Sequence, residues 1–494
     1  MFRPKRYVLV LSAWLIVQPA WAVQWQSIAP GIEYAEMQLP GPVEVFVARA
    51  DRQHKGWTID VMMAKGLAKG AREIVPEMAR RADDSVNFLG ERYDAKVAIN
   101  GDYFNPTTGV PFGGQVVGGW FVRRYPEYSG GSGFLWMLDG RAVMGGNVRN
   151  AAKWQRVRFA DGTEMNIHKL NDPRGQDELA LYTWQYADRT DAADAGVEVL
   201  VRMSAPVVIM PDGGGVPGEI VSVVESKGGT LLPYDHVVLS GHGRAAEKLR
   251  QHAKKGEQLR VELTLADYGN EDLGLAPADW KGAYAGMGAA TYILVNGKVP
   301  RHWEAKAEKL AREGKRHGSV VKDPRTLVAF NERYVYFVVI DGRSNRSIGM
   351  NFTEAGEFCR DHLKADFAVT QDGGGSSIMW VDGEVRNRPS DKNKAGETVF
   401  RPVANGYLMA TLQPAEWSRK FSPDERIVTA KNVELRLGPG SQFGVADELK
   451  AGASGTIVSH KLTGIRAKGT FWWNCRFANA EGWLPQDALE SATR

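Results

Sequence analysis

The sequence predicts an α+β fold: a mixed-sheet domain that carries helices, with an inserted all-β region and a further small domain at the C-terminus. Three observations support this prediction. Residues 24–68 alternate apolar and polar side chains, as half-buried strands do. Residues 334–370 read in the order strand, helix, strand. Many short apolar runs, separated by Gly and Pro, fill residues 150–275.

The first 22 residues have the pattern of a cleaved secretory signal. Basic residues precede an apolar stretch that is too short to span a bilayer, and Ala20-Trp21-Ala22 supplies a cleavage signature. We therefore expect a secreted or periplasmic protein with no membrane span after signal removal, and a retained N-terminal anchor is the alternative. The main domain is expected at 23–412, with the β-rich insertion at about 150–275. A linker at 413–425 and a final domain at 426–490 follow.

Charge and cysteine content exclude several classes of partner. The net charge is +4, and three positive residues lie in the predicted signal, which leaves +1 (4 − 3) for the mature chain. This balance gives no support for a nucleic-acid partner. The only cysteines, Cys359 and Cys475, are expected to be two separately buried thiols, and a disulfide is the alternative. The nine histidines show no zinc-site spacing, so we expect no metal and no cofactor.

Helices are expected at about 76–90, near 303–314, and at 354–364, where Thr353 is a good N-cap. The third of these helices separates two apolar strands, at 334–340 and 366–370. Crossover units of this kind join parallel strands, whose carboxyl ends share one edge of a sheet. The residues that follow the two strands are therefore predicted to face one cleft.

Three turns share one design, in which a short apolar strand runs into a carboxylate or amide beside glycine. They are Ile99-Asn100-Gly101-Asp102, Ile340-Asp341-Gly342-Arg343 and Thr370-Gln371-Asp372-Gly373-Gly374-Gly375-Ser376-Ser377. Polar groups at the ends of buried strands commonly build binding sites at a sheet edge. Asp341 and Asp372 are expected at one edge, and the strand at 95–99 is expected to add Asn100 and Asp102. Asp-Gly and Asn-Gly are also ordinary turn dipeptides, which is the alternative for each turn.

Six blocks together resemble the phosphodiester glycosidase family, and in order and spacing they cover roughly residues 24–412. The blocks are Ile99-Asn100-Gly101-Asp102-Tyr103-Phe104, Asp323-Pro324-Arg325-Thr326, Asp341-Gly342-Arg343-Ser344, Asp372-Gly373-Gly374-Gly375-Ser376-Ser377, Asn387-Arg388-Pro389-Ser390 and Arg401-Pro402-Val403-Ala404-Asn405. Two features depart from the family pattern. Asp102 stands where the animal sequences have a small residue, and Phe352-Thr353-Glu354 is a looser version of a Thr-rich helix entry. The substrate contacts of animal members therefore cannot be carried over.

The resemblance implies hydrolysis between the anomeric carbon of a sugar and a phosphate oxygen. Such a transition state is oxocarbenium-like and needs a nearby carboxylate, and arginine holds the phosphate best. Asp372 is predicted to be that carboxylate, and Asp341 a second catalytic carboxylate that acts as base or acid. The predicted substrate-binding residues are Asn100, Asp102, Arg325, Arg343, Gly374, Ser376, Ser377, Arg401 and Asn405.

Each of these residues also has a structural alternative. The aspartates can serve only as turn residues, and the arginines of the predicted phosphate clamp can serve only in salt bridges. Three functions stay open: a secreted phosphodiester glycosidase, a glycosidase of the same fold that acts on a non-phosphorylated polysaccharide, and a non-catalytic protein that binds cell-wall glycan. A divalent cation held by Asp341 and Asp372 is a further alternative.

The C-terminal segment resembles a bacterial SH3 domain. The resemblance is carried by Asn432-Val433-Glu434-Leu435-Arg436-Leu437-Gly438-Pro439-Gly440, Phe443, Gly452, Trp472-Trp473 and Gly482-Trp483-Leu484. It implies a small β-barrel that binds cell-wall peptide or glycan. The alternative is that the tryptophans are core residues and the barrel is a spacer.

Overall fold

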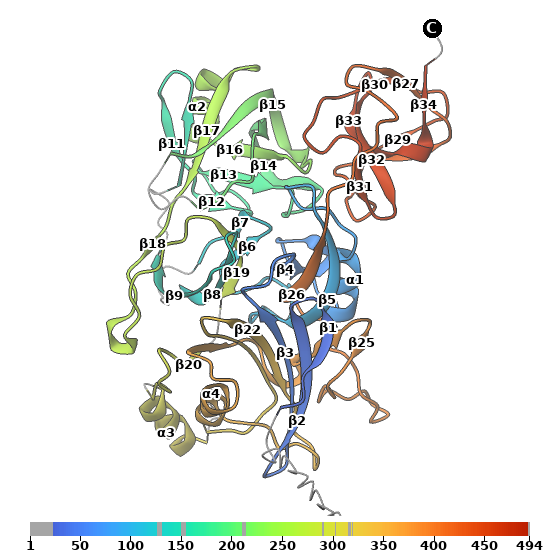
Figure 1. Cartoon of the computed structure of the whole chain (residues 1–494). Helices are drawn as coiled ribbons and strands as arrows, with labels where there is room; N and C mark the ends of the chain where they lie inside the picture. The colour runs from blue at the N-terminus through green and yellow to red at the C-terminus, as the bar shows by residue number, and fades with distance from the viewer. Residues whose placement is uncertain are drawn as a thin grey trace, which may run out of the picture.

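The computed structural model describes residues 23–125, 131–149, 155–209, 214–288, 291–301, 303–314, 318 and 320–492. The predicted signal at 1–22 lies outside them. Within the described residues there are 34 strands in five sheets and four α-helices (Figure 1). The α+β prediction is therefore wrong, because the chain is mostly β and its sheets are almost entirely antiparallel. Apolar runs indicate strands, but they do not specify which strands pair or in which direction.

A seven-stranded sheet contains the predicted strand, helix, strand segment. Its order is β1-β2-β3-β22-β21-β23-β20. α4 (Phe352–Asp361) connects β22 to β23 and packs on β20. β21 pairs antiparallel with both β22 and β23, so these two strands run in the same direction with β21 between them. The predicted common direction is confirmed. The strands are β1 (Gln26–Ala29), β2 (Ile32–Leu39), β3 (Val43–Asp51), β20 (Thr291–Leu294), β21 (Arg325–Phe330), β22 (Tyr334–Ile340) and β23 (Phe367–Thr370).

A five-stranded sheet of order β25-β24-β5-β26-β4 lies beside it. Its strands are β4 (Trp57–Met63), β5 (Arg92–Asn100), β24 (Met379–Val381), β25 (Glu384–Val385) and β26 (Asn405–Gln413). The expectation that Asn100 ends a strand of the same sheet as Asp341 and Asp372 is therefore wrong. α1 (Val75–Ala82) packs on β5 and ends well before residue 90, where the sequence predicted its end.

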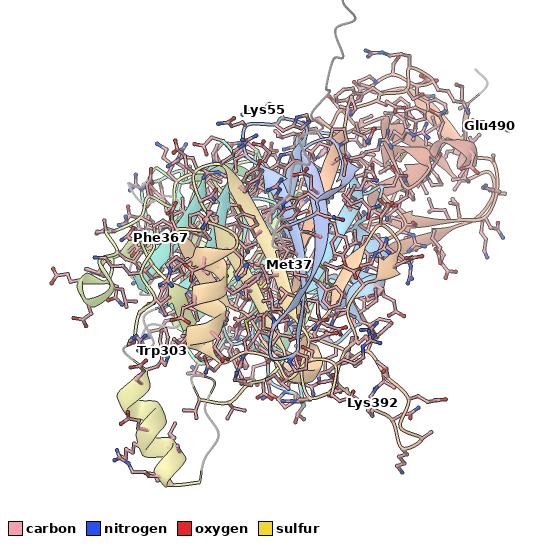
Figure 2. The ribbon with its side chains drawn as sticks, turned by 60° about the horizontal axis from the view of Figure 1, so that its bottom comes forward. Met37, Lys55, Trp303, Phe367, Lys392 and Glu490 are labelled. Atoms are coloured by element: carbon pink, nitrogen blue, oxygen red, sulfur yellow. The ribbon has the colours of Figure 1, made fainter. Side chains whose placement is uncertain are left out.

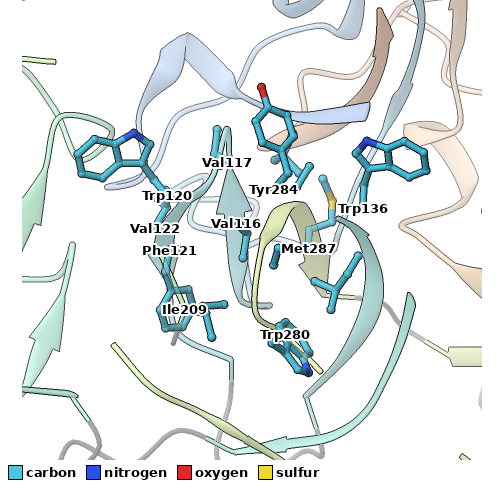
Figure 3. Packing of buried hydrophobic residues seen from close by; sticks show 14 of the residues in the cluster. Val116, Val117, Trp120, Phe121, Val122, Trp136, Ile209, Trp280, Tyr284 and Met287 are labelled. Carbon is cyan, nitrogen blue, oxygen red and sulfur yellow. The ribbon is translucent and has the colours of Figure 1, made fainter. Parts of the chain in front are cut away.

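Two further sheets enclose most of the large apolar core. The six-stranded sheet comprises β6 (Gln115–Val117), β7 (Trp120–Arg123), β8 (Gly131–Met137), β9 (Ala142–Arg149), β18 (Ala266–Asp267) and β19 (Ala283–Gly288). Figure 3 shows how side chains of this sheet, such as Val116 and Phe121, gather in that core together with Trp280 from the loop before β19. The eight-stranded sheet comprises β10 (Gln155–Phe159), β11 (Glu164–Asn166), β12 (Lys169–Leu170), β13 (Leu179–Thr183), β14 (Arg189–Met203), β15 (Val216–Leu231), β16 (His236–Gly241) and β17 (Gln258–Leu263). α2 (Arg244–His252) packs on β14 and β16.

The C-terminal residues form one antiparallel sheet, which does not establish the predicted SH3-like barrel. Its strands are β27 (Arg426–Thr429), β28 (Val433–Arg436), β29 (Val445–Leu449), β30 (Ser454–Ile457), β31 (Ile465–Ala467), β32 (Thr470–Arg476), β33 (Glu481–Pro485) and β34 (Leu489–Ser491). Trp472, Trp473 and Trp483 are all buried, so their rings contribute to packing. The backbone N–H of Tyr234 donates to the carbonyl of Leu437 at 2.8 Å. This bond links the C-terminal sheet to the sheet formed by β10–β17.

The N-cap of α4 differs from the predicted one. α4 is capped by Asn351 and not by Thr353, because the side chain of Asn351 and that of Glu354 each accept from the other's backbone N–H. α3 (Glu304–Arg312) begins beside Trp303 and projects from the body of the molecule (Figure 2).

Both cysteines are buried and unbridged, as predicted. No helix among the described residues is long and apolar enough to cross a membrane.

Candidate functional site

The carboxyl ends of β22 and β23 lie at one edge of the seven-stranded sheet, beside the start of β21. Ile340 pairs with Arg325, and the backbone of Gln371 donates to the carbonyl of Thr326 at 2.8 Å. Asp341 and Asp372, which follow these strands, are therefore brought to the same edge. The five-stranded sheet meets this edge, because the backbone N–H of Asp372 donates to the carbonyl of Gly101 at 2.9 Å.

Asp372 is a half-buried carboxylate beside a hydroxyl and a guanidinium. Its Oδ2 accepts from Ser376 Oγ at 2.5 Å, and Ser376 Oγ also accepts from Arg401 Nη1 at 3.3 Å. Burial raises the pKa of Asp372 above its ordinary value, and the bond from Ser376 and the charge of Arg401 oppose that rise. The carboxylate is thus positioned by its neighbours and stays partly open to solvent.

Arg401 is held in a fixed orientation by Asp391. Its Nε and Nη2 donate to the two carboxylate oxygens of Asp391 at 2.8 and 2.9 Å, which is the paired geometry that guanidinium favours. Gly375 packs directly against this pair, since a Cβ there would lie 2.0 Å from Asp391 Oδ1. Residues 392–400 between Asp391 and Arg401 are all exposed, and Figure 2 labels Lys392 at the start of this projecting segment.

Arg343 lies against the same glycine turn at Gly374. Its Nε donates to Asp323 Oδ1 at 3.0 Å, and its side chain is 44% exposed. A Cβ on Gly374 would lie 2.9 Å from Arg343 Nη2, so the guanidinium rests against the bare backbone of the turn. Gly374 has a φ of +64°, a conformation that glycine adopts without strain. Two guanidiniums therefore lie against the turn that carries Asp372.

Arg325 has a more buried position than the other two arginines of the predicted clamp. It is 7% exposed, and its Nε donates to the carbonyl of Met350 at 2.9 Å. Its Nη2 donates to the carbonyls of Val321 and Gly318 at 2.7 and 3.2 Å. These bonds tie the start of β21 to the loop before it and to the start of α4.

Asp341 is buried, and each of its two carboxylate oxygens accepts a hydrogen bond. Asn387 Nδ2 donates to Oδ1 at 2.9 Å, and the backbone N–H of Arg388 donates to Oδ2 at 2.8 Å. Asp341 is 3% exposed, and burial raises its pKa to about 6. The same Asn387 amide donates to the carbonyl of Ser377 at 3.1 Å, which links Asp341 to the turn of Asp372. Ser377 is itself buried.

Asn100 joins the two sheets at the site. Its Nδ2 donates to the carbonyl of Asp372 at 2.7 Å. Its Oδ1 accepts from Thr326 Oγ1 at 2.6 Å and from the backbone of Ile378 at 3.2 Å. Asn100 is fully buried, so these contacts place it behind the turn and away from solvent.

Asp102 and Asn405 are both buried next to Gly101. Asp102 Oδ1 and Oδ2 accept from the backbones of Tyr103 and Gly113, both at 2.7 Å. Burial raises the pKa of Asp102 to about 7, and the nearby charge of Asp372 adds to that rise. Asn405 is fully buried, and a Cβ on Gly101 would lie 2.5 Å from its Oδ1.

Four residues that complete the site escaped prediction as functional residues. Asp391, Asn387 and Asp323 each hold a predicted residue in place, and the hydroxyl of Tyr103 lies within electrostatic range of Asp372 and Arg325. Asn387, Asp323 and Tyr103 stand inside the family blocks, and Asp391 directly follows one. The family blocks therefore indicated these positions, but the sequence did not indicate which side chains the four residues contact. Among the described residues, no group of three or more His, Cys, Asp or Glu side chains is arranged to hold a metal ion.

Comparisons with known proteins agree in part with the sequence blocks. No curated protein shows significant similarity to the chain. Similar solved structures include a hypothetical protein from Synechocystis, at 15% identity and TM-score 0.48, with 77% of this chain and 62% of that chain covered. A putative exported protein from Burkholderia pseudomallei has 22% identity and TM-score 0.46, with coverages of 76% and 74%. The catalytic domain of zebrafish N-acetylglucosamine-1-phosphodiester alpha-N-acetylglucosaminidase, auto-inhibited by its pro-peptide, has 14% identity and TM-score 0.38, with coverages of 78% and 84%.

These structural similarities establish neither an activity nor a substrate for this chain. A sequence model of the phosphodiester glycosidase family matches residues 214–410. That segment contains five of the six blocks, and the block at 99–104 lies outside it. The predicted resemblance is therefore confirmed for this segment, which includes Asp341, Asp372 and Arg401. Residues 214–410 are similar to phosphodiester glycosidase domains.

Proposed function

We propose that this chain is a secreted glycoside hydrolase that cleaves the bond between an anomeric carbon and a phosphate oxygen in an envelope or extracellular glycan. The observation that supports this most directly is the arrangement around the triple-glycine turn. There, the partly exposed carboxylate of Asp372 and the guanidinium of Arg401 both bond to Ser376 Oγ, and the guanidinium of Arg343 lies against Gly374 of the same turn. The similarity of residues 214–410 to phosphodiester glycosidase domains gives independent support.

In this proposal Asp372 acts at the anomeric carbon. An ionised carboxylate stabilises or attacks an oxocarbenium-like centre, and the bond from Ser376 orients it. Arg343 contributes exposed Nη groups, which can donate two hydrogen bonds to phosphate oxygens. The guanidinium of Arg401 is already ion-paired with Asp391. We therefore propose that Arg401 chiefly orients Ser376 and stabilises the negative charge of Asp372. Phosphate is a good leaving group and needs less help from a general acid than a sugar alcohol does.

The buried members of the set act as positioning residues in this scheme. Asn100 fixes the backbone of Asp372, and Arg325 fixes the start of β21. Asp341 fixes Asn387, which in turn fixes the backbone of Ser377. Asn100, Arg325 and Asp341 are all buried, whereas Asp372 is partly exposed. The predicted role of Asp341 as second catalytic carboxylate is accordingly replaced in this proposal by a positioning role.

The decisive experiment measures hydrolysis by the purified mature protein on sugar-1-phosphodiesters and on aryl-glycosides of the same sugars. Asp372→Asn is expected to lower kcat/KM on phosphodiesters by about 10²- to 10³-fold, because the charge at the transition state is lost. Asp382→Asn is the matched control. Asp382 also precedes a glycine after a strand, but it lies in the exposed hairpin turn between β24 and β25.

The outcomes separate the alternatives. Turnover confined to phosphodiesters supports the proposal. Turnover on aryl-glycosides alone would show a glycosidase whose bond contains no phosphate. Equal activity of the wild type and Asp372→Asn would contradict the assigned site, and absence of any turnover would favour a glycan-binding protein.

A further inference from the structure

A cavity of about 160 Å³ lies where three parts of the fold meet, and no residue of the triple-glycine turn is in its lining. β4, α1 and β5 contribute one wall, which includes Met78 and Tyr93. Trp184 and Tyr234, which flank strands of the eight-stranded sheet, form a second wall. Phe443, in the loop between β28 and β29 of the C-terminal sheet, forms a third. The cavity therefore exists only where the C-terminal sheet is docked.

Aromatic rings dominate two of these walls. The ring centroids of Trp184, Tyr234 and Phe443 lie 5.3–5.4 Å from one another. The remaining lining combines aliphatic and methionine side chains with polar, charged and further aromatic ones. Flat apolar rings of this kind offer a surface on which another ring can pack.

The cavity also contains buried polar atoms that have no hydrogen-bond partner within the part of the chain that the structure describes. Gln185 is 1% exposed, and neither its Nε2 nor its Oε1 is bonded. Trp184 Nε1 and Gln442 Oε1, which also belong to lining residues, are unpaired as well. An unpaired buried polar group costs about 1–3 kcal/mol of stability. Two donor groups and two acceptor groups are thus available to a ligand.

Two charged groups of the lining, Asp60 and Arg81, already have partners, whereas the charged residues Lys65 and Asp188 are exposed. Asp60 accepts from Tyr93 Oη at 2.8 Å, from the backbone of Val61 at 2.7 Å, and from that of Gly118 at 2.8 Å. Arg81 pairs with Glu73. The interior therefore offers no free charge to an ionic ligand. The cavity also reaches the surface, since the exposed residues Lys65 and Asp188 belong to its lining.

Size narrows the class of ligand further. A cavity of roughly 150 Å³ holds a molecule with a single six-membered ring. An apolar ring would leave the amide of Gln185 and the two other groups unsatisfied, and an ionic ring would lose its hydration without gaining a counter-charge. A pyranose has an apolar C–H face, and hydroxyls at its edge that donate and accept.

We infer that this cavity is a second ligand site that binds one neutral sugar ring, with Gln185 as the specificity-determining residue and Phe443 as a packing surface. The inference does not rest on the proposed hydrolase activity. Binding here would hold the C-terminal sheet against the rest of the molecule, because the ligand contacts all three walls.

The test uses the full mature chain, titrated calorimetrically with the methyl glycosides of glucose, galactose, mannose and N-acetylglucosamine, and with indole as an apolar ring. Gln185→Leu removes the amide and keeps its approximate shape, so its thermal midpoint is expected to equal or exceed that of the wild type. Binding of at least one glycoside is expected, and Gln185→Leu is expected to weaken it about tenfold or more.

Gln53→Leu, at an exposed position, is the matched control and is expected to bind the glycoside as the wild type does. Asp372→Asn is expected to retain binding too, which separates this site from the triple-glycine turn. Equal affinity of the wild type and Gln185→Leu, binding of indole but of no glycoside, or no binding at all would each overturn the inference.

Discussion

The hydroxyl of Ser376 donates to Asp372 Oδ2 at 2.5 Å and at the same time accepts from Arg401. Ser376 thereby couples the orientation of the Asp372 carboxylate to that of the Arg401 guanidinium. Ser376 is 1% exposed, whereas Asp372 is only half-buried, so the orienting group is protected from solvent and the oriented group is accessible. Its exposure distinguishes Asp372 from Asp341 and Asp102, which are both buried.

Ser376→Ala is expected to shift the acid limb of the pH–activity profile upward. The bond from Ser376 stabilises the ionised form of Asp372 and lowers its pKa, so its removal leaves burial less opposed and the pKa rises. Since the proposed reaction needs the ionised carboxylate, activity is lost as the pH falls through this pKa. The measurement is kcat/KM on a phosphodiester between pH 4 and 8. An unmoved acid limb would contradict the role given to Ser376.

Gly375→Ala is expected to lower activity by roughly tenfold or more. Its Cβ would lie 2.0 Å from Asp391 Oδ1 and 2.3 Å from Arg401 Nη2, so the ion pair that orients Ser376 must move. Gly375 does not have a positive φ, so the effect is steric.

Gly175→Ala is the control for this substitution, because its Cβ would meet only the carboxylate end of Glu178, a flexible side chain. Steady-state kinetics and the thermal midpoint are compared for both variants. Unchanged activity in Gly375→Ala would show that the Asp391–Arg401 pair is not needed in its observed position.

Asp341 is expected to make stability depend on pH between about 4 and 6. Its folded pKa is raised to about 6, above an unfolded value near 3.9, so the folded state holds the proton more firmly. The contribution of this carboxyl to the free energy of unfolding is therefore fully present below pH 4 and falls as the pH rises to 6, by roughly 1–3 kcal/mol.

The measurement is the thermal midpoint of the wild type and of Asp341→Asn at pH 4.5 and pH 7.5. The stability advantage of the wild type should shrink as the pH rises. Asp382→Asn, in an exposed turn, should show no such trend. An advantage that stays constant with pH would mean that Asp341 is not desolvated in solution.

Asp235→Asn is expected to weaken the attachment of the C-terminal sheet. Asp235 is buried and accepts from His460 Nε2 at 2.7 Å, while His236 Nδ1 lies 2.7 Å from its other oxygen. The two histidines hold the pKa of Asp235 well below its ordinary value, against the effect of burial. Its contribution to stability is thus present above the unfolded pKa of about 4 and is lost as the pH falls through the lower folded value.

At pH 7 the loss in Asp235→Asn should be about 1.5–3 kcal/mol, as for other hydrogen bonds to charged groups. Differential scanning calorimetry of the full chain gives the measurement. Asp161→Asn breaks an Asp–His pair with a distance of 2.6 Å on the surface, and it should leave the thermal midpoint nearly unchanged. Equal effects of the two substitutions would exclude a structural role for the buried pair.

The sequence predicted several parts of the site from local pattern. The apolar strands before Asp341 and Asp372 and the common direction of those strands are both present. Such features depend on neighbouring residues, which sequence pattern records directly. The overall fold class was wrong, because pairing of β21 with both β22 and β23 depends on residues far apart in the chain.

By itself, the sequence determined that polar groups follow buried strands and that glycines leave room beside them. It could not separate Asp341 from Asp372, since both follow an apolar strand and precede glycine. The tertiary structure separates them, because Asn387 and the backbone of Arg388 bond both oxygens of the buried Asp341, whereas Asp372 accepts from Ser376 and stays partly exposed. Exposure and pairing result from contacts between distant segments, and no local pattern encodes those contacts.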